Sequence, residues 1–152
     1  MALQVFSSAF ADGSRIPELH TCDGADLSPP LEWGGEPPET RSFALIVEDP
    51  DAPNGTWCHW LLYDLPVTVH AVAQGYRPGM PGLGGTNDFG KLGYGGPCPP
   101  KGHGPHRYIF KLYALDVETL GLGEGAKRQK FLQAVGGHSL GEAQYSGRFE
   151  RR

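Results

Sequence analysis

The chain has 152 residues, of which 39% are hydrophobic and 20% charged, and its formal net charge is −4 with the histidines neutral. This length suits one domain, and a net negative charge without a basic cluster argues against a nucleic-acid partner. The 23 glycines and 14 prolines follow no G-X-Y period, which excludes collagen and predicts many turns.

Targeting signals and metal motifs are absent from the sequence. No apolar run reaches about 18 residues, and no basic start precedes an apolar stretch, so we expect no integral membrane association and a cytoplasmic location. Cys22, Cys58 and Cys98 are odd in number and share no CxxC spacing. We therefore expect three free thiols, no structural zinc and no cofactor.

Short strands dominate the predicted elements. Residues 42–49, SFALIVED, are apolar almost throughout and predict a central strand buried on both faces. Only residues 124–138 predict a helix, which Gly136 and Gly137 would end. The result is a single, mainly β domain over residues 1–152. In chain order the predicted strands are 3–10, 31–33, 42–49, 56–66, 106–116 and 142–149.

A long connection rich in glycine and proline covers residues 75–104. Ordered connections longer than about 12 to 15 residues are uncommon unless they build a binding surface. We therefore predict that this segment contributes to a ligand site.

The stretch EDPDAPNGTWCHW, residues 48–60, supplies the first candidate site residues. Asp49 and Asp51 follow the buried strand, and the prolines between and after them stop the strand and hold the carboxylates at its rim. Asp residues beside proline also cap turns, so a purely structural role is the alternative.

His59 lies on the next predicted strand. On extended backbone it shares a face with Trp57 and Leu61, whereas Cys58 points to the other face. A Cys58 and His59 nucleophile and base pair is therefore excluded, and Cys58 is predicted to be a core residue. A buried histidine with satisfied hydrogen bonds is the structural alternative for His59.

The second candidate stretch is GPCPPKGHGPHRY, residues 96–108. It carries Cys98, His103, His106 and Tyr108 from a loop into a strand, and parity places His106 and Tyr108 on one face. Arg107 faces the other side and is predicted to form a structural ion pair.

These two motifs, DPDAP with the following WCHWLLYDLP and GPCPPKGHGPHRYIFKLYALD, resemble the phosphatidylethanolamine-binding protein family in its bacterial and archaeal, Raf-kinase-inhibitor-like branch. The resemblance covers most of the chain, as far as HSLGEAQYSGRF. It implies a β-sandwich with a central antiparallel sheet, a second smaller sheet and one or two short helices. It also implies an anion pocket at one rim, and we add Asp51 as a carboxylate near a ligand amine. By position the pocket would use Asp49, Trp57, His59, Cys98, Pro100, His106 and Tyr108.

The resemblance implies a small anion-binding module that takes phosphate-like or phosphorylethanolamine-like groups. The eukaryotic members inhibit kinases or scaffold partners, so a protein partner is expected as well. Those members carry a C-terminal helix that has no counterpart in this sequence, and a homodimer is expected by analogy with bacterial relatives.

Two other functions use the same residues. Asp49, His59 and His106 could carry acid and base chemistry on a phosphoester or acyl compound, but no G-x-S-x-G motif is present and no nucleophile has an evident base. We therefore expect no catalysis. A metal could be held by Asp49, His59, Cys98, His103 and His106, although their spacing matches no common zinc pattern.

Overall fold

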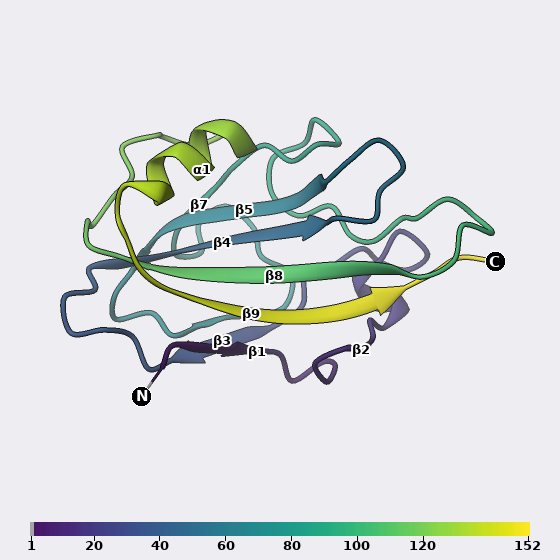
Figure 1. Ribbon diagram of the computed structural model, residues 1–152, viewed down its shortest axis with the longest axis horizontal. Coiled ribbons are helices and arrows are strands. Elements are labelled where there is room, and N and C mark those ends of the chain that lie inside the picture. The colour runs from purple at the N-terminus through teal and green to yellow at the C-terminus, as the bar shows by residue number, and fades with distance from the viewer. Residues whose placement is uncertain (1) are drawn as a thin grey trace.

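The computed structural model describes residues 2–152 and arranges them in three layers, with a small sheet, a large sheet and one α-helix (Figure 1). The large sheet has the order β2-β9-β8-β4-β5-β7, in which only the β2 and β9 pair is parallel. Its strands are β2 (Ser14–Arg15), β9 (Ser139–Phe149), β8 (His106–Leu115), β4 (Ser42–Asp49), β5 (Trp57–Pro66) and β7 (Leu83–Gly84). The small antiparallel sheet has the order β1-β3-β6, with β1 (Gln4–Phe6), β3 (Leu31–Gly34) and β6 (Ala71–Val72).

Strand β4 lies inside the large sheet, and all eight of its residues are buried. Phe43, Leu45 and Val47 face the small sheet and join the larger core cluster. Ala44 and Ile46 face the other way and pack in the core that α1 (Arg128–Gly136) closes. The alternation of a strand therefore places one apolar set in each core, which explains why the sequence is apolar at every step.

The mainly β architecture with two sheets and one α-helix confirms the predicted fold class. The predicted strands all correspond to observed ones, and the predicted helix is present but begins at Arg128. The sequence pattern missed β2, β6 and β7, which have two residues each, and the 3-10 helix η1 (Glu18–His20). Among the residues that the structure describes, no helix is long and apolar enough to cross a membrane.

A β-bulge changes the predicted faces of β5. Val47 pairs with Trp60 and Glu48 pairs with Cys58, so His59 is the extra residue in this part of the ladder. Such a residue breaks the simple alternation. Cys58 and Leu61 consequently share one core, and the prediction that His59 shares a face with Leu61 was wrong.

The prediction of three free thiols was also wrong. Cys22 and Cys98 form a disulfide across a sequence separation of 76, with their Cα atoms 5.4 Å apart. Spacing rules do not reveal this pair, because the fold brings the loop after η1 against the long connection, where the Cys22 amide donates to the Pro97 carbonyl. Cys58 alone is free, and it is buried as predicted.

Candidate functional site

A cavity of about 220 Å³ lies where β4 ends and β8 begins, at the right-hand end of the molecule in Figure 1. Seven of the eight predicted pocket residues line it, and Asp51 does not. The long connection contributes Phe89, Cys98, Pro99 and Pro100, so this segment does build a wall of the cavity. The predicted residues in the wall are Asp49, Trp57, His59, Cys98, Pro100, His106 and Tyr108.

Asp49 and His106 form a buried pair at the base of the cavity. Nδ1 of His106 lies 2.6 Å from Oδ2 of Asp49, and the two side chains are only 2% and 4% exposed. Because an ionised carboxylate can only accept, Nδ1 of His106 carries the proton. Oδ1 of Asp49 accepts from the Asp51 amide at 2.7 Å. Both oxygens of Asp49 are therefore engaged, and its role is to orient His106.

His59 is held by the long connection. Its Nδ1 lies 2.7 Å from the Gly95 carbonyl oxygen and so donates to it. Burial lowers the pKa of His59, which favours the neutral ring. The neutral ring leaves Nε2 as a hydrogen-bond acceptor.

Tyr108 supplies a different group. Its side chain is buried, lines the cavity, and packs edge to face against His59 with the ring centroids 5.2 Å apart. Its hydroxyl makes no hydrogen bond to any described residue. Burial and the nearby Asp49 raise the pKa of Tyr108, so the hydroxyl keeps its proton. A buried hydroxyl without a partner is unusual, and here it is a donor available to a ligand.

Asp51 is engaged outside the cavity. Its carboxylate receives two guanidinium hydrogen bonds from Arg107, at 2.9 and 3.0 Å, and the Arg107 amide at 2.9 Å. The Arg107 guanidinium lowers the pKa of Asp51 to about 2. The predicted ion-pair role of Arg107 is thus observed, and its partner is the carboxylate that we had placed near a ligand amine.

The predicted pocket residues did not include Ala52, Pro53, Asn54, Phe89 and Pro99 of the lining, or His103 beside it. Phe89 packs edge to face against both Trp57 and His59. It lies in the long connection, where the alternation of a strand cannot be used to predict which way a side chain points. His103, which we considered only as a metal ligand, places Nδ1 2.6 Å from Nε2 of His106. The motif KGHGPH could have indicated the contact between His103 and His106, because a tight loop brings residues three apart in the sequence close together.

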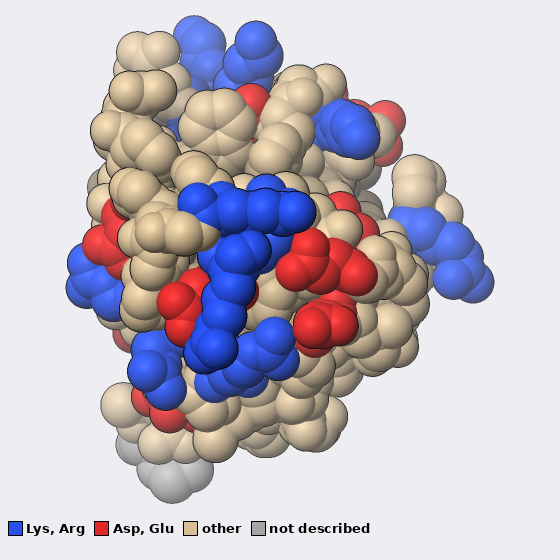
Figure 2. All heavy atoms as spheres, turned by 90° about the vertical axis from the view of Figure 1, so that its right-hand side faces the viewer, with Lys and Arg blue, Asp and Glu red and all other residues tan. Residues whose placement is uncertain are grey.

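Basic side chains gather beside this site. The strand register places Arg107 opposite Arg148, and Arg148 beside Arg15, so three exposed arginines cross three adjacent strands. Figure 2 shows Lys and Arg gathered in a band across this end of the molecule. Arg107 is neutralised by Asp51, whereas the Nε of Arg148 donates only to the Gly13 carbonyl. Arg15 also pairs with Glu18, at 3.6 Å, so Arg148 is the arginine of these three that has no acidic partner among the described residues. It adds positive charge beside the cavity although the chain as a whole is negative.

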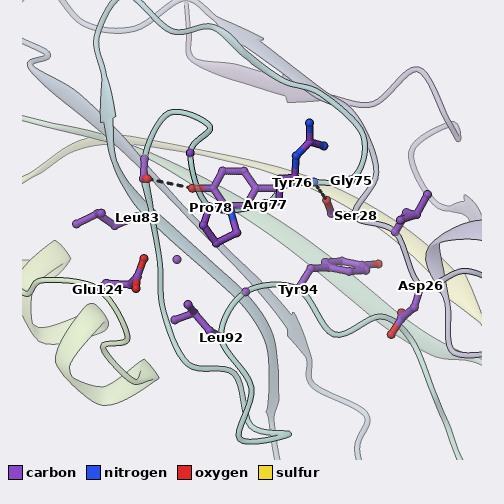
Figure 3. Close-up of a pocket in the computed structure, with 15 residues that line it drawn as sticks. Asp26, Ser28, Gly75, Tyr76, Arg77, Pro78, Leu83, Leu92, Tyr94 and Glu124 are labelled. Atoms are coloured by element: carbon purple, nitrogen blue, oxygen red, sulfur yellow. Dashed lines mark hydrogen bonds between the residues drawn. The ribbon is translucent and has the colours of Figure 1, made fainter.

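A larger cavity of about 490 Å³ lies elsewhere, between the long connection and the segment after η1 (Figure 3). Its hydroxyl groups are satisfied within the protein, whereas the side chains of Arg77 and Glu124 make no hydrogen bond or ion pair with the described residues. The Tyr76 hydroxyl donates to Gly82 and the Tyr94 hydroxyl to His20, while Ser28 accepts from the Tyr76 amide. The larger cavity differs from the smaller one in that none of its lining residues carries a buried polar atom without a partner among residues 2–152, whereas Tyr108 in the smaller cavity does.

The metal reading finds no support in the geometry. Within residues 2–152, no three His, Cys, Asp or Glu side chains gather in a way that could hold a metal ion. Cys98, one of the proposed ligands, is in the disulfide.

The comparisons with known proteins agree with the motifs. The sequence profile described as "Phosphatidylethanolamine-binding protein" matches residues 6–150. The chain belongs to the phosphatidylethanolamine-binding protein family. A UPF0098 protein of Aquifex aeolicus is 46% identical over 153 residues, which cover 98% of this chain and 89% of that one.

Two solved structures of bacterial members share the fold. The homolog CT736 from Chlamydia trachomatis superposes with a TM-score of 0.90 at 40% identity, covering 99% of each chain. Escherichia coli YbcL, described as a new member of the mammalian family, has a TM-score of 0.93 at 32% identity, covering 100% of each chain. The fold of this chain is therefore that of the bacterial family members.

Proposed function

We propose that the cavity formed by β4, β5, β8 and the long connection binds a small phosphate-bearing ligand, either phosphate or a small ester such as O-phosphorylethanolamine. The observation that carries this proposal is the Tyr108 hydroxyl, which is buried in the cavity wall and has no partner among the described residues. An unmade buried hydrogen bond destabilises a folded protein by about 1 to 3 kcal/mol, and a ligand oxygen would remove that cost.

The other polar groups suit a phosphate that carries one proton or an attached amine. His106, once protonated, offers an N–H from Nε2, while the acceptor Nε2 of His59 can receive a hydrogen bond from a P–OH or an ammonium group. The rest of the wall is largely apolar, with Trp57, Phe89 and prolines, which strengthens charged hydrogen bonds by excluding water. Arg148, which has no acidic partner among the described residues, would attract anions to this end of the molecule.

Calorimetric titration of phosphate and of O-phosphorylethanolamine, with metals chelated, tests this proposal. We expect binding by the wild type and a loss of at least tenfold in affinity for His106→Ala. His138→Ala is a matched control, because His138 forms an exposed pair with Asp116 at the opposite end of β9. No binding of either compound to the folded wild type would refute the proposal.

We predict that the site binds without catalysing a reaction. Among residues 2–152, no Ser, Thr or Cys side chain donates a hydrogen bond to His59 or His106. Burial also raises the pKa of the Cys58 thiol to about 12, so it cannot act as a thiolate near neutrality. If the wild type releases phosphate from a phosphoester and His106→Ala does not, this prediction is wrong and the site is that of an enzyme.

A kinase-inhibitor-like or scaffolding role, with a protein partner or a second copy of the chain, stays a proposal that the family supports. The cytoplasmic location also stays a prediction. The disulfide weighs against it, because such bonds persist mainly in oxidising compartments. Alkylation of thiols in intact cells, before lysis, would show whether Cys22 and Cys98 are oxidised there.

A further inference from the structure

His103 lies at the mouth of the site on a short glycine loop. The loop follows Pro100, and both neighbours of His103, Gly102 and Gly104, have positive φ values of 77° and 87°. The Gly102 amide donates to the Arg151 carbonyl and anchors the loop, but a Cβ added at either glycine would meet nothing within 4 Å, so open space surrounds the two positions that flank His103. His103 itself is exposed. The imidazole can therefore leave its position without disturbing a core.

The contact between His103 and His106 fixes where the protons lie. Nδ1 of His106 donates to Asp49, so the neutral ring carries a lone pair at Nε2. Nδ1 of His103 lies 2.6 Å from that nitrogen, and a single proton must lie between them. With neutral His106, the proton belongs to His103, which then donates.

This arrangement blocks the nitrogen that an anion would use. A phosphate oxygen needs an N–H at Nε2 of His106, but in this structure that nitrogen accepts from His103. An anion can bind there only if His106 gains a proton and His103 withdraws. The proton comes from solvent, and no bond between heavy atoms changes.

We propose that His103 is a latch that competes with the ligand for Nε2 of His106, so that anion binding takes up a proton at His106 and displaces His103. The proposal rests on the phosphate site proposed above. The exchange is favourable with a phosphate because a hydrogen bond from an imidazolium to an anion is stronger than one between two neutral rings. The latch thus lowers affinity for uncharged or weakly charged ligands, because their hydrogen bond to His106 is too weak to offset the loss of the bond between His103 and His106.

Other charged groups around His106 do not replace this role. Asp49 from β4 is committed to Nδ1, and His59 from β5 is committed to the Gly95 carbonyl. The Asp51 and Arg107 pair neutralises itself, and Arg151, after β9, donates through Nε to the Pro99 carbonyl. Tyr108 keeps its proton because burial raises its pKa. His103 is the neighbour whose contact with His106 can open.

Calorimetric titration of phosphate into wild type and His103→Ala at pH 7 tests the latch, in buffers that differ in ionisation enthalpy so that proton uptake is counted. We expect His103→Ala to bind about three- to tenfold more tightly, because one competing neutral hydrogen bond is gone. His138→Ala, which removes an exposed histidine far from the site, should bind like the wild type. Wild-type binding should take up protons.

Nuclear magnetic resonance of the imidazole nitrogens gives a second readout that a purely structural role would not move. Without ligand and with neutral rings, His103 should carry its proton on Nδ1, and adding phosphate should shift its signals to those of a free, solvated imidazole. If the wild type binds phosphate and His103→Ala binds it with the same affinity, the latch is overturned but the proposed phosphate site is not. Weaker binding would make His103 a ligand residue and also overturn the latch. Phosphate binding by neither protein would overturn the latch and the proposed function together.

Discussion

Tyr108 is buried like a core residue but carries a hydroxyl that no other described residue satisfies. Evolution toward stability alone would favour phenylalanine at such a position, because a buried hydroxyl without a partner is destabilising. The position of this hydroxyl in the cavity wall is the basis of the proposal that a ligand accepts its hydrogen bond.

Replacing that hydroxyl should change affinity and stability in different directions. In Tyr108→Phe we expect phosphate affinity to fall about five- to tenfold, while the free energy of unfolding stays the same or rises by up to about 1 kcal/mol. Calorimetric titration and urea denaturation of the same preparation measure both. Unchanged affinity, or a loss of stability above about 1 kcal/mol, would show that the hydroxyl serves the fold.

His59 gives a prediction about acid stability. Burial lowers its pKa, so below about pH 6.5 the unfolded chain binds more protons than the folded one, and the free energy of unfolding falls as pH falls. His59→Asn keeps a donor for the Gly95 carbonyl but removes the titrating ring. Urea denaturation from pH 7 to 5 should therefore show a shallower loss for His59→Asn than for wild type. Equal slopes would contradict this.

Predicting the face of a side chain from the alternation of a strand succeeded where the strand pairing is regular and failed at a β-bulge. His106 and Tyr108 were placed on one face correctly, because the register of β8 with β9 is unbroken there. The face of His59 relative to Leu61 was wrong because a bulge adds one residue opposite β4. The engagement of Asp51 by Arg107 also could not be read from the sequence, since it depends on the turn after β4 lying against the start of β8.

At the scale of elements, long strands can be predicted from the sequence and short strands cannot. The eight to eleven residues of β4, β5, β8 and β9 repeat their apolar pattern several times. Strands of two residues, such as β6 and β7, show no period at all. They form because neighbouring strands offer hydrogen-bonding groups.

The helix α1 has an N-terminus that can be improved. Lys127 occupies the N-cap position with extended backbone, its side chain caps nothing, and its charge opposes the helix dipole. Lys127→Asp should raise the free energy of unfolding by about 1 kcal/mol, as measured by urea denaturation. Lys127→Ala removes the charge without adding a cap and should gain less. Equal gains in the two variants would assign the effect to charge alone.

At the scale of the whole molecule, the disulfide is the main device that the sequence did not reveal. It joins the segment after η1 to the wall of the small cavity, because Cys98 lines that cavity. The exposed position of Cys22 leaves one of the two sulfur-bearing residues open to solvent reductants.

Thiol counts and stability test this bond. Unfolded in denaturant without reductant, the chain should show one reactive thiol, Cys58, and three after reduction. Cys22→Ser combined with Cys98→Ser should lower the free energy of unfolding by about 4 kcal/mol, the value expected for closing a loop of this length. Three reactive thiols without reductant would show that the bond does not form.

The same bond makes residues 22–98 a covalent ring from which two free arms extend. Trp57, His59 and Phe89 belong to the ring, whereas His106 and Tyr108 belong to the C-terminal arm, so the cavity is the place where arm and ring meet. If the two ends of the oxidised chain are pulled apart, the ring stays closed, and the fully extended chain is shorter by about 250 Å than that of the reduced protein. Under tension, the C-terminal arm would move away from the ring and the cavity between them would open, while residues 22–98 stay linked at Cys22 and Cys98.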